Sequence, residues 1–361
     1  MPYQVAVIGA GPSGSVAAYI LAEKGYKTVL LDRKKFPRKK TCAGGLTYKV
    51  EGLLKYIGIE ISELPIERVF ERVKVMGYGR EIEVEMDPWV ISTTNRSSFD
   101  KSLADIAVSS GAHFIDGISI TEVRRREGAF EIIAGSRIEA EKLVIAEGAI
   151  PFVSRKLGIR DFWPKNEVIF ALEAERKGDF KDIEFRMDAV DMGYGWVFPR
   201  NGSASVGVGG LSHPAVIKRR FQEMFGSDGI SAGIIPIAGN RKLEAEGAFL
   251  VGDIAGLADP MTGEGIYYGM RSAVEVARAL TEGKSYEYLM KPVIEDLSLR
   301  RKVASIVLPR MKKFFLIMVD KEEIAERFTW ASAGKIQFKD FIKWVMFKFP
   351  SLIPSLLKAF L

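Results

Sequence analysis

The chain has 361 residues, 47% of them hydrophobic, which is enough for roughly two to three domains with a sizeable core. A single cysteine, Cys42, excludes an internal disulfide framework and fits a reducing compartment, and with only two histidines the spacing excludes a metal cluster. The formal net charge of +6 is concentrated in the C-terminal segment 286–361, and no nucleic-acid-binding motif accompanies it.

The N-terminus and the hydropathy favour a cytoplasmic protein. The first residues lack a basic region and a cleavage site, so we expect no signal peptide. No run reaches the roughly 18 uncharged apolar residues that a membrane-spanning helix needs.

The first stretch of the chain predicts a nucleotide-binding βαβ unit. An apolar strand over 5–8 precedes Gly9, Gly11 and Gly14, which have G-x-G-x-x-G spacing and lead into an Ala-rich helix. The first glycine permits a tight turn, the second lets a pyrophosphate approach the backbone, and the third lets helix and strand pack closely. The free N–H groups of the first helical turn attract phosphates, and Asp32, which ends the next strand, can accept hydrogen bonds from ribose hydroxyls.

A basic loop follows, from Arg33 to Lys40, and ends in the small residues of 42–45. One interpretation is a solvated run of charge. The other is a ligand-binding loop, because small residues let the backbone approach a flat ligand and basic residues suit a diphosphate.

The next elements alternate between two parts of the molecule. A helix over 49–57 and strands over 69–78 and 81–86 indicate an excursion into a second domain. A helix that begins at about Asn95 returns the chain to the nucleotide-binding part. Short strands are then expected near 113–116, 118–123, 129–133 and 142–148.

Strands dominate from 166 to 211, and one of them carries an aromatic stripe. Tyr194, Trp196 and Phe198 alternate along the chain, so all three face one side of a strand. One interpretation is the core face of an antiparallel sheet, and the sharper one is an aromatic wall for an apolar ligand.

A second ligand-binding motif follows a helix near 215–225. An apolar strand ends at Asp253, whose carboxylate can bind a ribityl or pyrophosphate group. The turn Gly263-Glu264-Gly265 and Ile266 then open a long helix to about Glu282, a helix N-terminus of the phosphate-binding or flavin-binding type.

Over about residues 1–285 these motifs resemble the FAD sites of the glutathione reductase-like, hydroxylase-type flavoproteins. Within that group, Tyr194-x-Trp196-x-Phe198-Pro199, followed after seven residues by Gly207-x-Gly209, is similar to the signature of the geranylgeranyl reductases. That family saturates isoprenoid double bonds in archaeal membrane-lipid precursors or in the side chain of chlorophyll. The resemblance implies an FAD-dependent oxidoreductase acting on an isoprenoid lipid, with either ferredoxin or NAD(P)H as the external electron donor.

The resemblance also implies a fold class. We expect an α/β protein with a discontinuous Rossmann-like FAD-binding domain over 1–60, 95–160 and 245–285. An inserted antiparallel-sheet substrate domain is expected over 61–94 and 161–244, and a basic helical region over 286–361.

Site residues follow from the resemblance position by position. For FAD it implies Gly9, Gly11, Ser13, Gly14, Asp32 and Arg33 toward the adenosine diphosphate half, Arg96 and the backbone of Ile120 toward the adenine side, Cys42, Ala43 and Gly45 near the isoalloxazine ring, and Asp253, Gly263, Gly265 and Ile266 at the ribityl chain and ring. For the substrate it implies Tyr194, Trp196, Phe198 and Pro199. Cys42 is also a candidate catalytic proton donor, alongside water and the flavin itself.

Two positions depart from the family pattern. Ala43 stands where the family often has glycine. Ala146-Glu147-Gly148 replaces an Ala-Asp-Gly element that helps related hydroxylases use pyridine nucleotides.

Two other functions stay open at this point. A flavin monooxygenase or halogenase uses the same scaffold, although the Trp-x-Trp-x-Ile-Pro of halogenases is absent here. A non-catalytic prenyl-binding protein also resembles the scaffold without using a flavin, but Asp253 and the Gly263-Glu264-Gly265 turn argue against it.

The C-terminal segment predicts an amphipathic helix over 335–349. Lys335, Lys339 and Lys343 recur every four residues, while Phe338 and Phe341 lie on the apolar face. Either this face docks on the FAD-binding domain with the lysines solvated, or the lysines and aromatic side chains bind an anionic membrane surface.

Overall fold

The computed structural model describes residues 2–126, 128–237 and 242–350. Its first large sheet has eight strands. These are β1 (Tyr3–Ile8), β2 (Thr28–Leu31), β8 (His113–Ile115), β9 (Glu122–Arg126), β10 (Ala129–Ala134), β11 (Ser136–Ile145), β17 (Glu244–Ala245) and β18 (Ala248–Leu250). The order β18-β11-β1-β2-β8 is parallel throughout, as the predicted βαβ unit requires.

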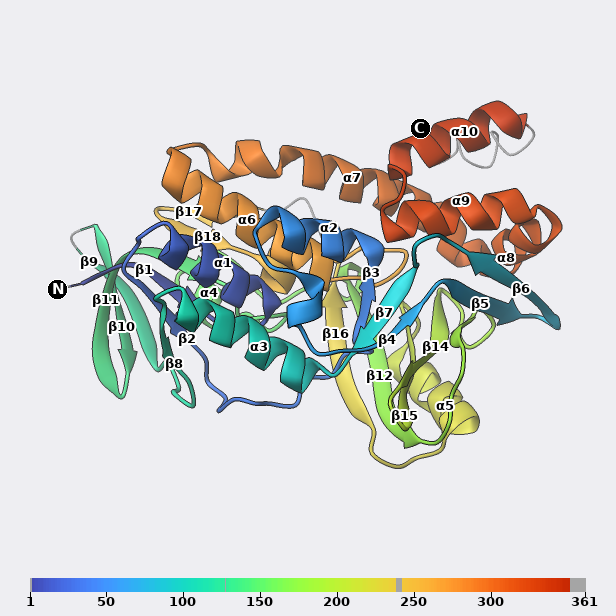
Figure 1. The fold of residues 1–361 in the computed structure, drawn as a ribbon, viewed down its shortest axis with the longest axis horizontal. Coiled ribbons are helices and arrows are strands. Elements are labelled where there is room, and N and C mark those ends of the chain that lie inside the picture. The colour runs from blue at the N-terminus through green and yellow to red at the C-terminus, as the bar shows by residue number, and fades with distance from the viewer. Residues whose placement is uncertain (1, 127, 238–241, 351–361) are drawn as a thin grey trace.

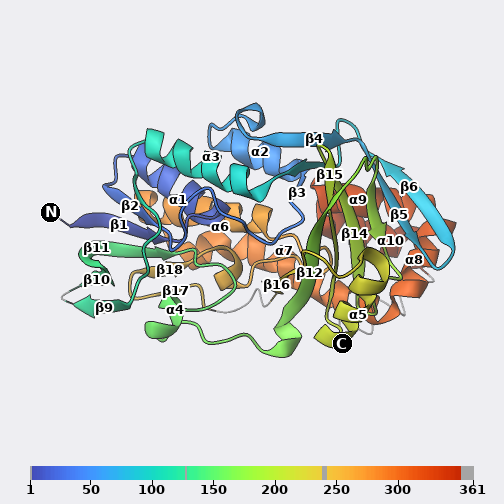
Figure 2. The ribbon, with the colours of Figure 1, turned by 90° about the horizontal axis from the view of Figure 1, so that it is seen from below.

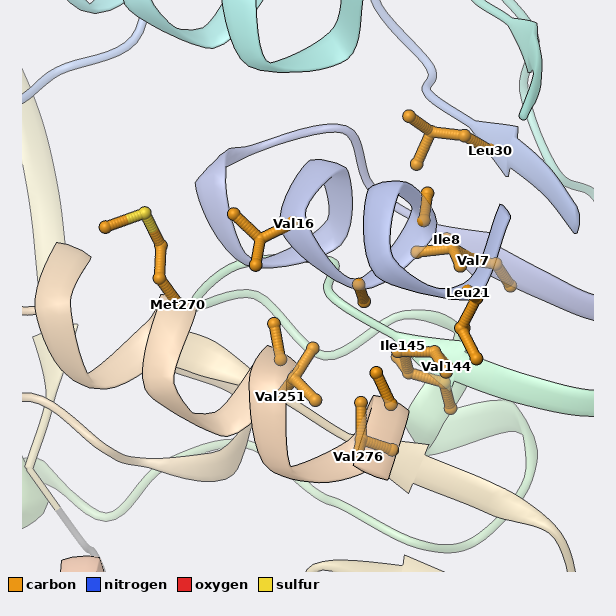
Figure 3. Packing of buried hydrophobic residues seen from close by; sticks show 14 of the residues in the cluster. Val7, Ile8, Val16, Leu21, Leu30, Val144, Ile145, Val251, Met270 and Val276 are labelled. Atoms are coloured by element: carbon orange, nitrogen blue, oxygen red, sulfur yellow. The ribbon is translucent and has the colours of Figure 1, made fainter. Parts of the chain in front are cut away.

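Three helices pack beside this sheet: α1 (Pro12–Glu23), α3 (Arg96–Ser109) and α6 (Ile266–Glu282). Helix α1 contacts both α3 and α6 (Figure 1). Figure 3 shows buried side chains of α1, α6 and the strands gathered in one core, with Val16 of α1 on the side of Met270 of α6. A nearly all-apolar α1 is explained by this position, since it is covered by the sheet and by two helices.

The second large sheet has seven strands in the order β16-β12-β15-β14-β13-β5-β6. They are β5 (Arg72–Gly77), β6 (Arg80–Glu85), β12 (Val168–Lys177), β13 (Ile183–Arg186), β14 (Gly193–Arg200), β15 (Ser203–Gly210) and β16 (Ser231–Pro236). All pairs are antiparallel except β5 with β13. Helix α5 (Pro214–Phe225) covers one face, with Ile217 and Phe221 fully buried.

A small sheet and a helix connect the two halves (Figure 2). The small sheet comprises β3 (Gly45–Thr47), β7 (Ile91–Thr94) and β4 (Ile66–Phe70), and the helix, α2 (Tyr48–Tyr56), follows β3. The expected α/β class, with a Rossmann-like sheet, an inserted and mainly antiparallel sheet and C-terminal helices, is confirmed. The small sheet joins β3 from the first expected domain to β4 and β7 from the second, so it crosses the expected boundary. The domain boundaries remain a proposal.

The strand expected over 118–123 lies later in the chain, over Glu122–Arg126. Strand β9 begins only at Glu122, because Ile118 donates its N–H to the carbonyl of Asp32 and the chain crosses the end of β2 there. This crossing brings the segment 118–120 to the edge of the sheet where the parallel strands end.

The C-terminal region is helical: α7 (Tyr286–Val307), α8 (Met311–Asp320), α9 (Glu322–Ala333) and α10 (Phe338–Lys348). Phe338, Phe341 and Ile342 are buried, so the apolar face of α10 docks on the protein. Its partners are α7 and α9, however, and not the FAD-binding domain named in the docking alternative. Lys339 and Lys343 are exposed, and residues 351–361 of the apolar tail lie outside the described residues.

Within the described ranges, none of the helices has the length and apolar character that crossing a bilayer requires.

Candidate active site

A cavity of about 1140 Å³ is lined by residues of both large sheets. Ordinary small-molecule pockets measure roughly 300–1,000 Å³, so this one has room for more than one ligand. It extends from the glycine turn after β1, along the loop 33–45, to strands β12 and β14 and helices α8 and α9.

The three glycines of the first turn have different roles. A Cβ at Gly9 would lie 2.2 Å from the carbonyl oxygen of Ala146, and one at Gly14 would lie 1.7 Å from that of Gly9. A Cβ at Gly11 would meet only the Arg38 guanidinium, at 3.6 Å, so this position faces the cavity. Gly14 was expected to contact the cofactor, but it does not line the cavity, because it is packed against the turn itself.

Two helix N-termini meet at this end of the cavity. Helix α1 begins after Gly11 and α6 after Gly265, and neither has a side-chain cap. The hydroxyl of Ser13 fits between them, because a Cβ at Gly252 or Gly269 would come within 2.6 or 2.4 Å of it. Uncapped N–H groups and the positive ends of two helix dipoles therefore converge on one place, which is suited to a diphosphate.

Asp32 lies at the end of β2 and is largely engaged by the protein. Its carboxylate accepts the N–H groups of Ala10 at 2.9 Å and Lys34 at 2.8 Å. Arg38 lies 3.7 Å from Asp32 and 3.1 Å from Asp100, so it links the ends of β2 and α3. The basic loop is thus anchored at the cavity and is more than a solvated run of charge.

Arg96 is buried at the start of α3 and lines the cavity. Its guanidinium donates to Asp100 at 2.8 and 3.0 Å. Burial alone would lower the pKa of Arg96, but Asp100 and the neighbouring Cys42 raise it above its usual value. Arg96 was expected toward the adenine side, and the structure places it beside Cys42 instead.

The loop 42–45 is held from two sides. The Arg200 guanidinium donates to the carbonyl oxygens of Cys42 at 3.4 Å and Ala43 at 3.0 Å. A Cβ at Gly45 would lie 2.5 Å from the Phe198 ring, so only glycine lets this loop contact the aromatic strand. The partly buried Cys42 thiol lines the cavity, and so does the backbone that follows it.

The aromatic stripe forms one wall of the cavity. Tyr194, Trp196 and Phe198 all line it, and Phe185 packs edge-on against Tyr194 and Phe198. The Trp196 ring covers Gly207 of the neighbouring strand, where a Cβ would lie 1.9 Å from the ring. The aromatic strand and the Gly-x-Gly that follows it are therefore complementary surfaces in direct contact.

The ends of the stripe are fixed by hydrogen bonds. The Tyr194 hydroxyl donates to the carbonyl oxygen of Thr262, and burial raises the pKa of Tyr194 above its usual range. Pro199 was expected at the substrate, but it does not line the cavity, because its carbonyl turns to accept the Thr93 hydroxyl at 2.7 Å.

The cavity has a roof that the sequence did not indicate. Met311, Phe314 and Met318 of α8 and Phe328 of α9 line it, opposite apolar residues of β5 and β6. Arg300 of α7 ties this roof to the loop before α6, since it donates to Asp259 at 2.8 Å and to the carbonyl of Ala331. The sequence feature that could have indicated these helices is the apolar periodicity of 307–333, but periodicity predicts an apolar helix face and not the surface that this face covers.

Two partly buried acids of the cavity were also missed. Glu264 accepts the Thr47 hydroxyl and lies 2.5 Å from the Lys49 ammonium group. Glu173 of β12 has a carboxylate oxygen that is buried without a hydrogen-bond partner among the described residues. Burial raises the pKa of Glu173, although Arg200, the Cys42 N–H, Ser205 and Lys39 partly oppose the shift.

The arrangement fits a flavin dinucleotide. The open position at Gly11 and the two uncapped helix N-termini suit its diphosphate, and Asp32 suits a ribose. Of the residues expected at FAD, all except Gly14 line this one cavity. Glu147 also lines the cavity, and its carboxylate accepts N–H groups of 152–154 at the start of the short helix α4 (Val153–Lys156).

Comparisons with known proteins agree with this geometry. The model of the FAD binding domain family matches residues 2–177. The chain is 31% identical over 317 residues to digeranylgeranylglycerophospholipid reductase 1 of Methanosphaera stadtmanae, covering 78% of this chain and 76% of the relative. It is 29% identical over 329 residues to menaquinone reductase of Mycobacterium tuberculosis, covering 81% and 79%.

The fold is likewise similar to a solved structure. A geranylgeranyl bacteriochlorophyll reductase-like protein of Thermoplasma acidophilum superposes with a TM-score of 0.79 at 23% identity, over 99% of both chains.

Proposed function

Since the chain belongs to the geranylgeranyl reductase family of FAD-dependent oxidoreductases, we propose that it saturates C=C bonds of geranylgeranyl chains in membrane-lipid precursors of the archaeal type. The observation that carries the proposal is the two-part cavity. Its polar end has the glycine turn and two helix N-termini, while its other end is bounded by the aromatic wall and the helical roof. An extended apolar chain is the ligand that the second part suits.

The reaction explains why both parts are needed. An isolated alkene has no polarising carbonyl, so its reduction needs a strong hydride donor, close positioning and a dry pocket. Reduced FAD supplies the hydride when it is bound. We assign its diphosphate to Gly11 and Ser13, a ribose to Asp32, and its ring end to the loop 42–45 and the turn at Gly265.

The protein's own residues prepare the apolar end. Trp196 and Phe198 present aromatic faces to an isoprenoid chain, and Met311 and Phe314 exclude water from above. Arg200 and Phe198 fix the loop that carries Cys42, so the position of the reacting alkene relative to that loop is set before binding.

The test is anaerobic turnover. Protein reduced with dithionite is given a geranylgeranyl glycerolipid or a menaquinone, and products are identified by mass spectrometry. We expect saturated isoprenoid without oxygen. Product that forms only with oxygen would point to a monooxygenase or halogenase, and bound FAD without any turnover would refute the reductase. Ferredoxin and NADPH, supplied in place of dithionite, then identify the electron donor.

We also propose that the enzyme works at an anionic membrane surface, through a mouth patch formed by Ile150, Phe152, Arg155, Lys156 and Phe162. The three apolar side chains are 53%, 48% and 58% exposed and lie at the edge of the cavity. Arg155 lies 4.5 Å from the Phe162 ring centre and Lys156 lies 5.2 Å from that of Phe152. Aromatic side chains paired with cations suit the interface of an anionic bilayer, from which an insoluble substrate could enter directly.

Vesicle sedimentation tests the mouth patch. Full-length protein should bind phosphatidylglycerol vesicles in a salt-sensitive manner, and the double variant Phe152→Ser/Phe162→Ser should lose most of that binding. Tyr288→Ser is the matched control, because Tyr288 is 72% exposed on α7 and does not line the cavity. Equal loss in both variants, or no loss in either, would place the membrane contact elsewhere.

A further inference from the structure

Glu173 occupies a distinctive place in the cavity wall. Strand β12 turns Leu172 and Ala174 toward α5, so Ala171 and Glu173 face the cavity. Across the sheet, Glu173 pairs with Gly207 and Gly207 pairs with Trp196. Because Gly207 has no side chain and the Trp196 ring covers it, the indole and the Glu173 carboxyl share one row of the wall.

The surroundings of Glu173 connect it to the reactive end. The backbone N–H of Cys42 and the hydroxyl of Ser205 both favour its charged form, and Arg200, which holds the loop of Cys42, acts on it through space. Ser205 also accepts the Trp196 indole N–H at 3.4 Å. Yet one carboxylate oxygen stays buried without a hydrogen-bond partner in the described part of the chain, and no ion pair within 4.0 Å is formed there.

The other acids of the cavity are committed to different tasks. Glu264 is paired with Lys49, and Asp32 accepts two N–H groups and lies beside Arg38. Glu147 caps α4. Asp253 lies by the uncapped N-terminus of α6. Among the described acids that line the cavity, Glu173 is the one that has a buried carboxylate oxygen without a hydrogen-bond partner and also lacks an ion pair within 4.0 Å. Its loss of hydration favours a neutral carboxyl, and burial accordingly raises its pKa.

We propose that Glu173 is the acid that protonates the substrate alkene. The inference rests on the proposed function. Reduced FAD, when bound, would supply a hydride to one alkene carbon, and as the π bond breaks the other carbon takes the proton of the Glu173 carboxyl. The alkene gains two electrons and two hydrogens, the cofactor loses two electrons, and Glu173 is left as a carboxylate that regains its proton from water.

The assignment also gives roles to the neighbours of Glu173. Arg200, Ser205 and the Cys42 N–H stabilise the carboxylate that forms after proton transfer. They are positioning residues, since they act through Glu173. Cys42 then helps to place the acid through its backbone, so its thiol is not required as the proton donor.

Glu173→Gln and Glu173→Asp test the assignment, with Glu175→Gln as the matched control two residues along the same strand, where the side chain is exposed. We expect Glu173→Gln to bind FAD fully and to lose at least roughly 100-fold in the single-turnover rate of alkene reduction, as removal of a general acid does. Glu173→Asp should recover part of the rate, and Glu175→Gln should match the wild type.

A second readout does not depend on turnover. Infrared difference spectra across a pH titration should show, in the wild type and in Glu175→Gln, a protonated-carboxyl carbonyl band that persists above the ordinary titration range of Asp and Glu, and this band should be missing in Glu173→Gln. A wild-type rate in Glu173→Gln, or an unchanged band, would overturn the assignment. An inactive wild type would overturn the proposed function, whereas an active wild type with an equally active Glu173→Gln overturns the role of Glu173 alone.

Discussion

Adding one methyl group at Gly207 should disturb the aromatic wall directly. In Gly207→Ala the new Cβ would lie 1.9 Å from the Trp196 ring, while ordinary contacts begin at about 3.4 Å, so the ring must withdraw by roughly 1.5 Å. Overpacking of this kind costs about 1–3 kcal/mol. The ring can move only toward the cavity, so the wall should shift with it.

Gly209→Ala is the matched control. Its Cβ would meet Ala171 at 3.2 Å and the Trp196 ring at 3.5 Å, which the neighbours can accommodate by a few tenths of an ångström. We therefore expect a clear loss of stability in urea and weaker isoprenoid reduction in Gly207→Ala, and small effects in Gly209→Ala. Urea midpoints at constant slope measure the first effect, and KM for the geranylgeranyl substrate measures the second.

A double-mutant cycle isolates the contact. Trp196→Phe makes room for the added methyl, so Gly207→Ala/Trp196→Phe should be more stable than the sum of the single changes by about 0.5–3 kcal/mol. Additive single effects would refute the claim that Gly207 is needed because the indole covers it.

Further predictions concern the cofactor, the roof, the C-terminal helix and the cavity acid. Gly11→Val should fold normally but lose flavin absorbance, because its side chain enters the space that faces the cavity, and a full FAD complement would disprove the role of this turn. Arg300→Met should cost about 3–5 kcal/mol in urea unfolding, since it leaves Asp259 buried and unpaired, and Asp259→Asn in the same chain should restore part of that loss. Truncation after Gly334 should lower the thermal midpoint by uncovering the core under α10 but leave vesicle binding unchanged, whereas lost binding by folded protein would support a membrane role for α10. Burial raises the pKa of Glu173 in the folded protein above its ordinary 4.5. The free energy of unfolding should therefore fall as the pH rises from 4.5 through the folded-state pKa. Urea unfolding across that pH range measures this dependence, and Glu173→Gln should remove it.

The elements that could be predicted from the sequence depend on residues close together in the chain. The glycine turn, Asp32 and the helix after Gly265 follow from local spacing, and the alternation at Tyr194 places three aromatic rings on one face. What could not be predicted depends on distant partners. The periodicity of α10 gives it an apolar face but does not choose between α7, the FAD-binding sheet and a membrane.

Glu173 shows the same limit at a single residue. Strand alternation assigns it to the face of Ala171, but which face lines the cavity is decided by α5, which covers the other one. From the sequence alone, Glu173 looks like a solvent-exposed acid on a half-apolar strand. It becomes a candidate site residue only when α5 is known to cover the opposite face of that strand.

The pairing of strands from distant parts of the chain constrains the order in which the protein can fold during synthesis. Strand β1 pairs with β11, and β5 pairs with β13 after β11 has already returned the chain to the first sheet. During synthesis neither sheet can close early, and contacts this far apart in the chain make folding slow. FAD can acquire its full site only after α6 has left the ribosome, and no contiguous fragment that ends before α6 would contain that site.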